Sequence, residues 1–142
     1  MRKVTVIRFV LFLLLVPALF MACERQRSVE DEVRRTLDHR ERGLNQQDLK
    51  LYLSAISTHY AGSATAYEQV KDRIGSLFAG FDEIQYSSFD RSVYKEDQGM
   101  VRVVQRFTME LSNDEGRPQR VSGQEQLFLA PHEGRYLIVE GL

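Results

Sequence analysis

The sequence is poor in several residue types, and two features that it lacks limit what the protein can be. Its 142 residues include one cysteine, three prolines and no tryptophan. One cysteine cannot form a disulfide within the chain, so the core must be stable without covalent cross-links. Nineteen basic and twenty acidic residues give a net charge of -1, which lacks the basic excess of nucleic-acid-binding surfaces. We therefore expect no nucleic-acid partner.

A long apolar run is also missing. The most apolar stretch covers residues 9–22, which is fourteen residues and includes Pro17, whereas a membrane-spanning helix needs about 20. The stretch follows a cationic start that contains Arg2, Lys3 and Arg8. This three-part layout is typical of a secretory signal segment.

The only cysteine, Cys23, follows this stretch directly after the small residue Ala22. The Ala22-Cys23 pair resembles the lipobox of bacterial lipoproteins, although Phe20 stands where that motif usually has Leu. The resemblance implies cleavage between residues 22 and 23 and a diacylglycerol on the Cys23 thiol. A second interpretation is an incidental cysteine that follows a plain signal peptide or an uncleaved anchor.

Lipidation would determine both the location and the available chemistry of the chain. Residues 1–22 would be the signal peptide, residues 23–28 the lipidated cysteine with a short tether, and residues 29–142 one domain. Because two or more acyl chains anchor a protein stably, we expect attachment to a membrane of the bacterial cell envelope that faces the periplasm or exterior. A lipidated thiol could not act in catalysis or bind a metal. Neither metal-ligand spacing nor a glycine-rich phosphate loop is present, so no cofactor is expected.

Apolar residues at helical spacing predict three helices in the first half of the domain. Valines and leucines among charged residues predict a helix over residues 28–42 that ends at Gly43. Asn45 is expected to cap a short second helix, and Thr65 a third helix over residues 65–79. The charges of the first helix alternate in sign and are expected only to solvate its outer side.

After Asp82 the apolar residues alternate with polar ones, which is typical of strands. Turn-rich segments at residues 96–99, 113–118 and 131–134 separate four runs, so four antiparallel strands are predicted. Pairing neighbouring runs across their turns places two residues opposite each other when their numbers have a fixed sum. The sum is 196 across the first turn, 230 across the second and 266 across the third.

The predicted register brings opposite charges together on one face, which supports it. Asp90 lies opposite Arg106 and Glu110 lies opposite Arg120, whereas Phe89 meets Phe107 on the other face. The odd-numbered face is predicted to be buried beneath the helices. Its apolar members are Val93, Val103, Phe107, Met109, Leu111, Val121, Leu127, Leu129, Leu137 and Val139.

The order of the elements and the last strand resemble a known superfamily. Nuclear transport factor 2-like domains, including SnoaL-like domains, often end in Gly, a basic residue, Trp and an aliphatic strand, which corresponds here to Gly134, Arg135, Tyr136, Leu137 and Ile138. The resemblance covers residues 29–142. It implies an α+β fold in which three N-terminal helices pack on a curved four-stranded antiparallel sheet to form a cone. The superfamily contains isomerases, cyclases, dehydratases and non-catalytic binding or assembly modules, so the fold does not determine the function.

The predicted register also places three polar residues in one row across the apolar odd-numbered face: Arg91, Gln105 and Glu125. Polar groups on such a face must be satisfied, so they either pair with one another or await a ligand. Phe107 and Gly123 form the next row, where the glycine is expected to leave space beside Glu125. The carboxylate is then either a base with a raised pKa or an inert partner of Arg91.

Two further groups are candidates for binding. Tyr52, His59 and Tyr60 are expected near the mouth of the cone, where the histidine either contacts a ligand or is simply solvated. The even-numbered sheet face combines aromatic residues with arginine, which suits a homodimer contact or an envelope protein partner as well as a solvated face. Its members are Tyr86, Asp90, Tyr94, Arg102, Val104, Arg106, Phe128, Tyr136 and Ile138.

These features together predict a membrane-anchored cell-envelope lipoprotein whose cone domain binds a small apolar ligand or a protein partner without catalysis. The alternative is a small acid–base enzyme of isomerase, cyclase or dehydratase type, with Glu125 as the base and Arg91 or Gln105 stabilising negative charge. A third interpretation is a structural subunit of an envelope assembly that uses the even-numbered face.

Overall fold

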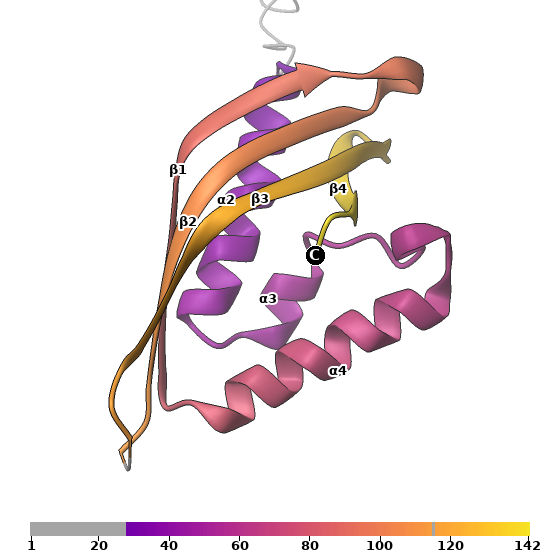
Figure 1. The fold of residues 1–142 in the computed structure, drawn as a ribbon. Helices are drawn as coiled ribbons and strands as arrows, with labels where there is room; N and C mark the ends of the chain where they lie inside the picture. Colours follow the sequence, from indigo (N-terminus) through magenta and orange to yellow (C-terminus); the bar gives the residue numbers. More distant parts are fainter. Residues whose placement is uncertain (1–27, 115) are drawn as a thin grey trace, which may run out of the picture.

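The computed structural model describes residues 28–114 and 116–142 (Figure 1). The signal segment, Ala22, Cys23 and the tether through residue 27 lie outside the described residues. The helices are α2 (Val29–Asn45), α3 (Leu49–Leu53) and α4 (Ala64–Gly80), with the short 3-10 helices η2 (Tyr60–Gly62) and η3 (Asp97–Gly99). The strands are β1 (Glu83–Lys95), β2 (Val101–Ser112), β3 (Gln119–His132) and β4 (Arg135–Glu140), and they form one antiparallel sheet in that order.

The helices and the sheet form two layers with the core between them. The long strands bend around α2, and α3 and α4 lie on the same concave side of the sheet (Figure 1). This arrangement confirms the predicted α+β fold, in which three helices pack on a curved four-stranded antiparallel sheet. No helix among the described residues is long and apolar enough to cross a membrane.

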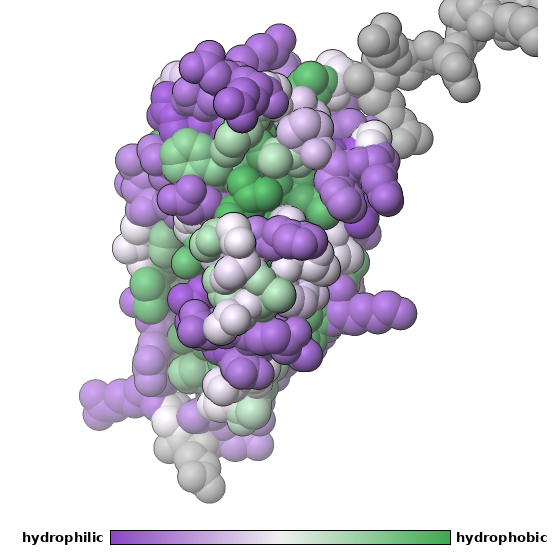
Figure 2. Space-filling model, turned by 90° about the vertical axis from the view of Figure 1, so that its right-hand side faces the viewer, coloured by the Kyte–Doolittle hydropathy of each residue, from purple (hydrophilic) through white to green (hydrophobic). Residues whose placement is uncertain are grey.

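One face of the molecule, seen in Figure 2, is mostly hydrophilic. Hydrophobic side chains gather in the upper half of that view and are bordered by hydrophilic ones. Some exposed apolar surface is normal for a globular domain.

Each of the three α-helices α2, α3 and α4 begins at a short polar side chain that accepts a hydrogen bond from a backbone N–H of the first turn. Ser28 does so for α2, Asp48 for α3 and Ser63 for α4. The predicted caps Asn45 and Thr65 are therefore wrong, because residues with extended backbone directly before the helices take this role. Asn45 instead ends α2 and Thr65 lies within α4.

Helix α2 continues past Gly43, where the sequence predicted its end. Gly43 does not end the helix; it allows α3 to approach closely. A Cβ on Gly43 would lie 2.5 Å from the backbone nitrogen of Tyr52. Two residues later, the Asn45 side-chain amide bonds to both the backbone N–H and the carbonyl of Tyr86, the latter at 2.9 Å. This pairing satisfies main-chain groups on the outer edge of β1, where an open strand would invite aggregation.

The β2–β3 register is confirmed throughout, from Val101 opposite Leu129 to Leu111 opposite Gln119. The predicted ion pair between Glu110 and Arg120 spans 3.7 Å and is exposed to solvent.

The β1–β2 register is only half correct, because a bulge interrupts β1 between Phe89 and Ser92. At the bulge Asp90 takes a left-handed backbone with φ of 53°, a conformation that Asp tolerates better than most residues. After the bulge the predicted pairing holds, but before it the pairing is shifted by one, so Phe89 lies opposite Arg106 and not opposite Phe107. Phe89 is consequently 40% exposed, whereas Tyr86, which was assigned to the outer face, is buried.

The β3–β4 register also differs from the predicted one, by one residue. Leu129 lies opposite Ile138, and the pairing shifts again before Phe128. Ile138 also exchanges backbone hydrogen bonds of 2.9 Å with the segment at Ala55 and Ser57 on its other side. Because this segment covers the edge of β4, Ile138 is fully buried and the prediction that it lies on the outer face is wrong.

We predict that Gly43→Ala destabilises the domain by about 1–3 kcal/mol, the usual cost of overpacking a filled core. The added methyl would overlap the backbone of α3, which cannot move aside like a side chain. The free energy of unfolding in urea would measure the effect. Gly80→Ala is the matched control, because a Cβ at the end of α4 meets nothing within 4 Å. Equal stability of the two variants would contradict the prediction.

Candidate functional site

A buried ion pair joins α2 to the centre of the sheet. Arg40 donates two hydrogen bonds of 2.9 Å to the two carboxylate oxygens of Glu125 on β3. The two side chains are only 8% and 13% exposed. Bidentate pairing of this kind is among the strongest polar contacts in proteins, and inside a core it must offset the loss of hydration of both charges.

Two neutral side chains complete the hydrogen bonding of this carboxylate. The hydroxyl of Tyr86 and the amide of Gln105 both donate to Glu125 Oε1, the amide at 2.6 Å. The same Tyr86 oxygen accepts a hydrogen bond of 3.1 Å from Arg40. Glu125 therefore accepts four hydrogen bonds in all, and both of its oxygens are occupied.

The network continues from Gln105 towards the surface. Arg91 Nε donates to Gln105 Oε1 at 2.8 Å, and Arg91 Nη2 donates to the hydroxyl of Ser88 at 3.0 Å. Ser88 in turn donates to a carboxylate oxygen of Glu41 on α2, at 2.8 Å. The structure thus brings together Arg91, Gln105 and Glu125, the row that the sequence singled out.

Sequence reasoning missed two members of this network, Arg40 and Tyr86. The alternating charges of the helix predict a solvated Arg40, but this side chain is only 7% exposed. A signal was present, because Arg40 lies three residues after Leu37 and four before Leu44, on the apolar stripe of the helix. Tyr86 was assigned to the outer face because the sequence contains no glycine to mark the bulge at Asp90.

The surroundings set the protonation states in the network. Burial alone would raise the pKa of Glu125, but the Arg40 guanidinium and the hydrogen bonds from Arg40, Tyr86 and Gln105 outweigh it and lower the pKa. Burial raises the pKa of Tyr86, so its hydroxyl stays neutral. Desolvation opposes the charge on Arg40, yet nearby Tyr52, Tyr86 and Glu125 raise its pKa overall. Glu125 is thus an ionised carboxylate that is paired with Arg40.

Aromatic rings fill the space beside this carboxylate. The rings of Tyr86 and Phe107 stack with centroids 5.8 Å apart, and the Arg40 guanidinium lies 5.2 Å from the centre of the Tyr86 ring. A Cβ on Gly123 would lie 3.2 Å from the Phe107 ring. The prediction that Gly123 leaves open space is therefore wrong, because Phe107 occupies it.

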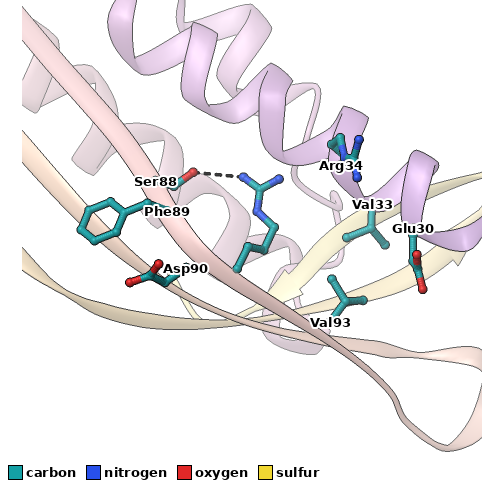
Figure 3. A pocket seen from close by; sticks show the side chains of 8 residues that line it. Glu30, Val33, Arg34, Ser88, Phe89, Asp90 and Val93 are labelled. Carbon is teal, nitrogen blue, oxygen red and sulfur yellow. Dashed lines mark hydrogen bonds between the residues drawn. The ribbon is translucent and has the colours of Figure 1, made fainter.

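An open groove lies where the network reaches the surface, between the start of α2 and the bulge of β1. Its volume is about 550 Å³. In Figure 3, Val33 and Glu30 of α2 lie across the groove from Val93 of β1. The residues that line it are Glu30, Val33, Arg34, Ser88, Phe89, Asp90, Arg91 and Val93. We call this feature the α2–β1 groove.

The residues predicted at the mouth of the cone do not form a site together. Tyr52 is buried next to Arg40. Tyr60 is also buried, and its hydroxyl bonds to the backbone of Leu142. His59 is exposed, and its ring contacts only the neighbouring Thr58 hydroxyl, at 3.3 Å. Among the described residues, no recorded hydrogen bond links His59 or Tyr60 to the network.

The outer sheet face keeps part of its predicted composition. The Arg102 guanidinium lies 4.4 Å from the Tyr94 ring centre and that of Arg106 lies 5.3 Å from the Phe89 ring centre. Tyr94 is 45% exposed. The described part of the chain holds no group of three or more His, Cys, Asp or Glu residues that could bind a metal ion.

We predict that Glu125→Gln destabilises the fold by about 3–5 kcal/mol at neutral pH, because it leaves the Arg40 charge buried without its partner. Chemical unfolding would measure the loss. Glu110→Gln is the control, since its exposed pair should be worth only about 0–1 kcal/mol. A double variant, Arg40→Met with Glu125→Leu, should be more stable than Glu125→Gln alone. A loss from Glu125→Gln as small as that from Glu110→Gln would refute this account.

The lowered pKa of Glu125 also predicts a pH dependence. A carboxylate with a lower pKa in the folded state stabilises the fold above its unfolded pKa, near the ordinary value of 4.5. That stabilisation is lost as the pH falls through the folded pKa. The stability difference between wild type and Glu125→Gln should therefore shrink as the pH is lowered below 4.5. Urea unfolding at a series of pH values tests this, and a constant difference would contradict it.

No protein-family model and no curated protein sequence matches this chain significantly. Solved structures do share its fold. One is a candidate scytalone dehydratase from Novosphingobium aromaticivorans, with 11% identity over 77% of this chain and 78% of that chain and a TM-score of 0.65. Another is a candidate dehydratase of the nuclear transport factor 2-like family from Streptomyces avermitilis, with 9% identity, coverage of 78% and 91%, and a TM-score of 0.64.

A third similar structure is a candidate association domain of calcium/calmodulin dependent protein kinase II from Xanthomonas campestris. It has 14% identity, coverage of 78% of this chain and 83% of that chain, and a TM-score of 0.64. Identities this low carry information about the fold and not about the chemistry. The curved sheet, the three helices and these similarities together show that the chain has the cone-shaped nuclear transport factor 2-like fold.

Proposed function

We propose that this chain is a lipid-anchored domain of the bacterial cell envelope that binds a ligand in the α2–β1 groove without catalysing a reaction. The observation that carries the proposal is the closed hydrogen-bond network around Glu125. It supports a structural role for the polar interior, and the α2–β1 groove is an open surface next to it.

A general base needs a free lone pair and a pKa near the working pH. Glu125 is poorly suited to this role, because Oε1 accepts three hydrogen bonds, Oε2 is held by the Arg40 guanidinium, and the pKa is lowered. Aromatic packing by Tyr86 and Phe107 leaves the carboxylate no open space on that side. These contacts argue against acid–base chemistry at this position.

The α2–β1 groove has the properties of a binding site. Its volume of about 550 Å³ falls within the range of small-ligand pockets, roughly 300–1,000 Å³. It combines apolar surface, such as that of the partly exposed Val93, with charged side chains such as Arg34. Apolar walls with a few polar groups provide both affinity and orientation for a ligand.

The anchor follows from the Ala22-Cys23 pair, which resembles a lipobox. A diacylated or triacylated Cys23 would hold the domain stably at a membrane surface. Helix α2 begins at Val29, so the tether is short and the domain would stay close to that surface. The outer sheet face, with its exposed Tyr94, is a second surface suited to a homodimer or envelope protein contact.

The second candidate function is an acid–base enzyme, which the similarity to candidate dehydratases favours. Such an enzyme would have to move Arg40 away from Glu125 before the carboxylate could accept a proton. A reaction that is lost in folded Glu125→Gln protein and kept in Glu110→Gln would support this alternative and refute the non-catalytic proposal.

We predict that the protein purified from membranes of a bacterial host begins at Cys23 and carries a diacylglycerol, with or without a further acyl chain. Intact mass spectrometry measures both features. The Cys23→Ser variant is the control and should carry no lipid. A wild-type chain that begins at another residue without lipid would contradict the proposed anchor, and Cys23, if still present, would then be a free thiol.

A further inference from the structure

We propose that the α2–β1 groove binds the headgroup of a zwitterionic phospholipid of the phosphoethanolamine type, taken from the membrane that holds the anchor. This inference rests on the proposed function, because it names the ligand of the same groove. Three features support it: the short stretch of chain between Cys23 and the start of α2, the charges that line the groove, and the net charge of the domain.

The groove lies close to the expected point of attachment. Five residues lie between Cys23 and Val29, and an extended chain spans at most about 3.6 Å per residue, so six residue steps place the start of α2 within about 22 Å of the Cα of Cys23. Glu30 and Arg34, which line the groove, belong to the first two turns of α2. A helix rises about 1.5 Å per residue, so both lie within about 8 Å of its start. The tether therefore lets the groove reach the headgroup layer.

The groove contains charges of both signs that remain without partners. Glu30 and Arg34 are one turn apart on the same helix face, yet neither takes part in any ion pair or hydrogen bond recorded for the described residues. Asp90, the other carboxylate of the lining, already pairs with Arg106 at 3.4 Å. The groove thus offers one unpaired guanidinium and one unpaired carboxylate.

This pair of charges is complementary to a phosphate that carries an ammonium group. Guanidinium groups recognise phosphate oxygens through two parallel hydrogen bonds, and the positive charge of Arg91, which also lines the groove, adds to that of Arg34. An ammonium group two carbons from the phosphate would pair with Glu30. The partly exposed Val93 provides an apolar contact for the glycerol carbons and the first methylene groups of the acyl chains.

The charge of the whole domain favours a zwitterionic lipid over an anionic one. After Ala22 the chain has sixteen basic and twenty acidic residues. A net acidic domain is repelled by an anionic membrane surface, whereas a zwitterionic headgroup carries no such penalty. Inorganic phosphate would lack the contact to Glu30, so the observations point to a phosphoethanolamine headgroup.

The test uses the mature lipidated protein in nanodiscs of phosphatidylcholine, either pure or mixed with phosphatidylethanolamine or with phosphatidylglycerol. Amide hydrogen exchange at residues 30–34 and 88–93 reports on the groove, and exchange in β2 serves as the internal reference. Phosphatidylethanolamine should slow exchange at the groove by about tenfold relative to the other two compositions, because the tether raises the local headgroup concentration to the millimolar range. The quaternary ammonium of phosphatidylcholine cannot donate a hydrogen bond to Glu30.

Arg34→Glu should abolish the protection, because it replaces the phosphate-binding charge by a repelling one. Arg34 is exposed, so the fold should survive the change, and unchanged exchange in β2 would verify this. Arg73→Glu on the exposed side of α4 is the matched control and should keep the protection. Equal protection in all three lipid compositions, greater protection by phosphatidylglycerol, or full protection in Arg34→Glu would overturn the proposal.

A failure of the anchor is distinguishable from a failure of the groove. Without lipid on Cys23 the protein shows the mass of an unmodified chain and does not enter nanodiscs. Dihexanoyl phosphatidylethanolamine, which is soluble as a monomer, is then added to the unlipidated protein. Slower exchange at residues 88–93 that Arg34→Glu prevents would support the groove alone, whereas no change would overturn it.

Discussion

The bidentate pair between Arg40 and Glu125 is the contact on which the rest of the interior depends. Removing two charges from water costs several kcal/mol for each ion, and only good geometry with further hydrogen bonds offsets that cost. Arg40 supplies two of the four bonds to the carboxylate, and Tyr86 and Gln105 supply the others. The pair is therefore stable only when β1, β2 and β3 are in the correct register and α2 is positioned over them. This requirement positions α2 over the centre of the sheet more specifically than apolar packing, which tolerates sliding.

The bulge at Asp90 is the backbone irregularity that makes this network possible. Without it the residues of β1 before the bulge would face the opposite side, and Tyr86 would lie on the outer surface, far from Glu125. With it, Tyr86 faces inward and stacks on Phe107, while Phe89 faces outward. The same bulge aligns Arg91 with Gln105 and forms one wall of the α2–β1 groove. A single extra residue in β1 thus shapes both the buried network and the open surface.

Sequence patterns predicted the order of the elements, the β2–β3 register and the row that contains Gln105 and Glu125. These features depend on local periodicity and on pairs of charges across short turns, which a single sequence displays. The bulge at Asp90 could not be predicted, because no glycine marks it and Asp at positive φ leaves only a weak signal. The side chain of Asn45, which bonds to the edge of β1, depends on a contact between elements that are distant in sequence. The burial of Arg40, in contrast, is predictable from the sequence, because Arg40 lies on the apolar stripe of the helix.

The network also explains why a fold shared with candidate dehydratases need not share their chemistry. An interior carboxylate can serve as a base only when it keeps some of its proton affinity, and Arg40 removes that affinity from Glu125. The polar interior then contributes to the stability and the specificity of packing. On this view, ligands bind outside the network. Arg91 is where the two regions meet, because its Nε is bound to Gln105 while its side chain lines the groove. A phosphate that draws on the Arg91 charge would compete with Gln105 for the same guanidinium. Binding at the groove would consequently be coupled to the buried ion pair through one shared side chain.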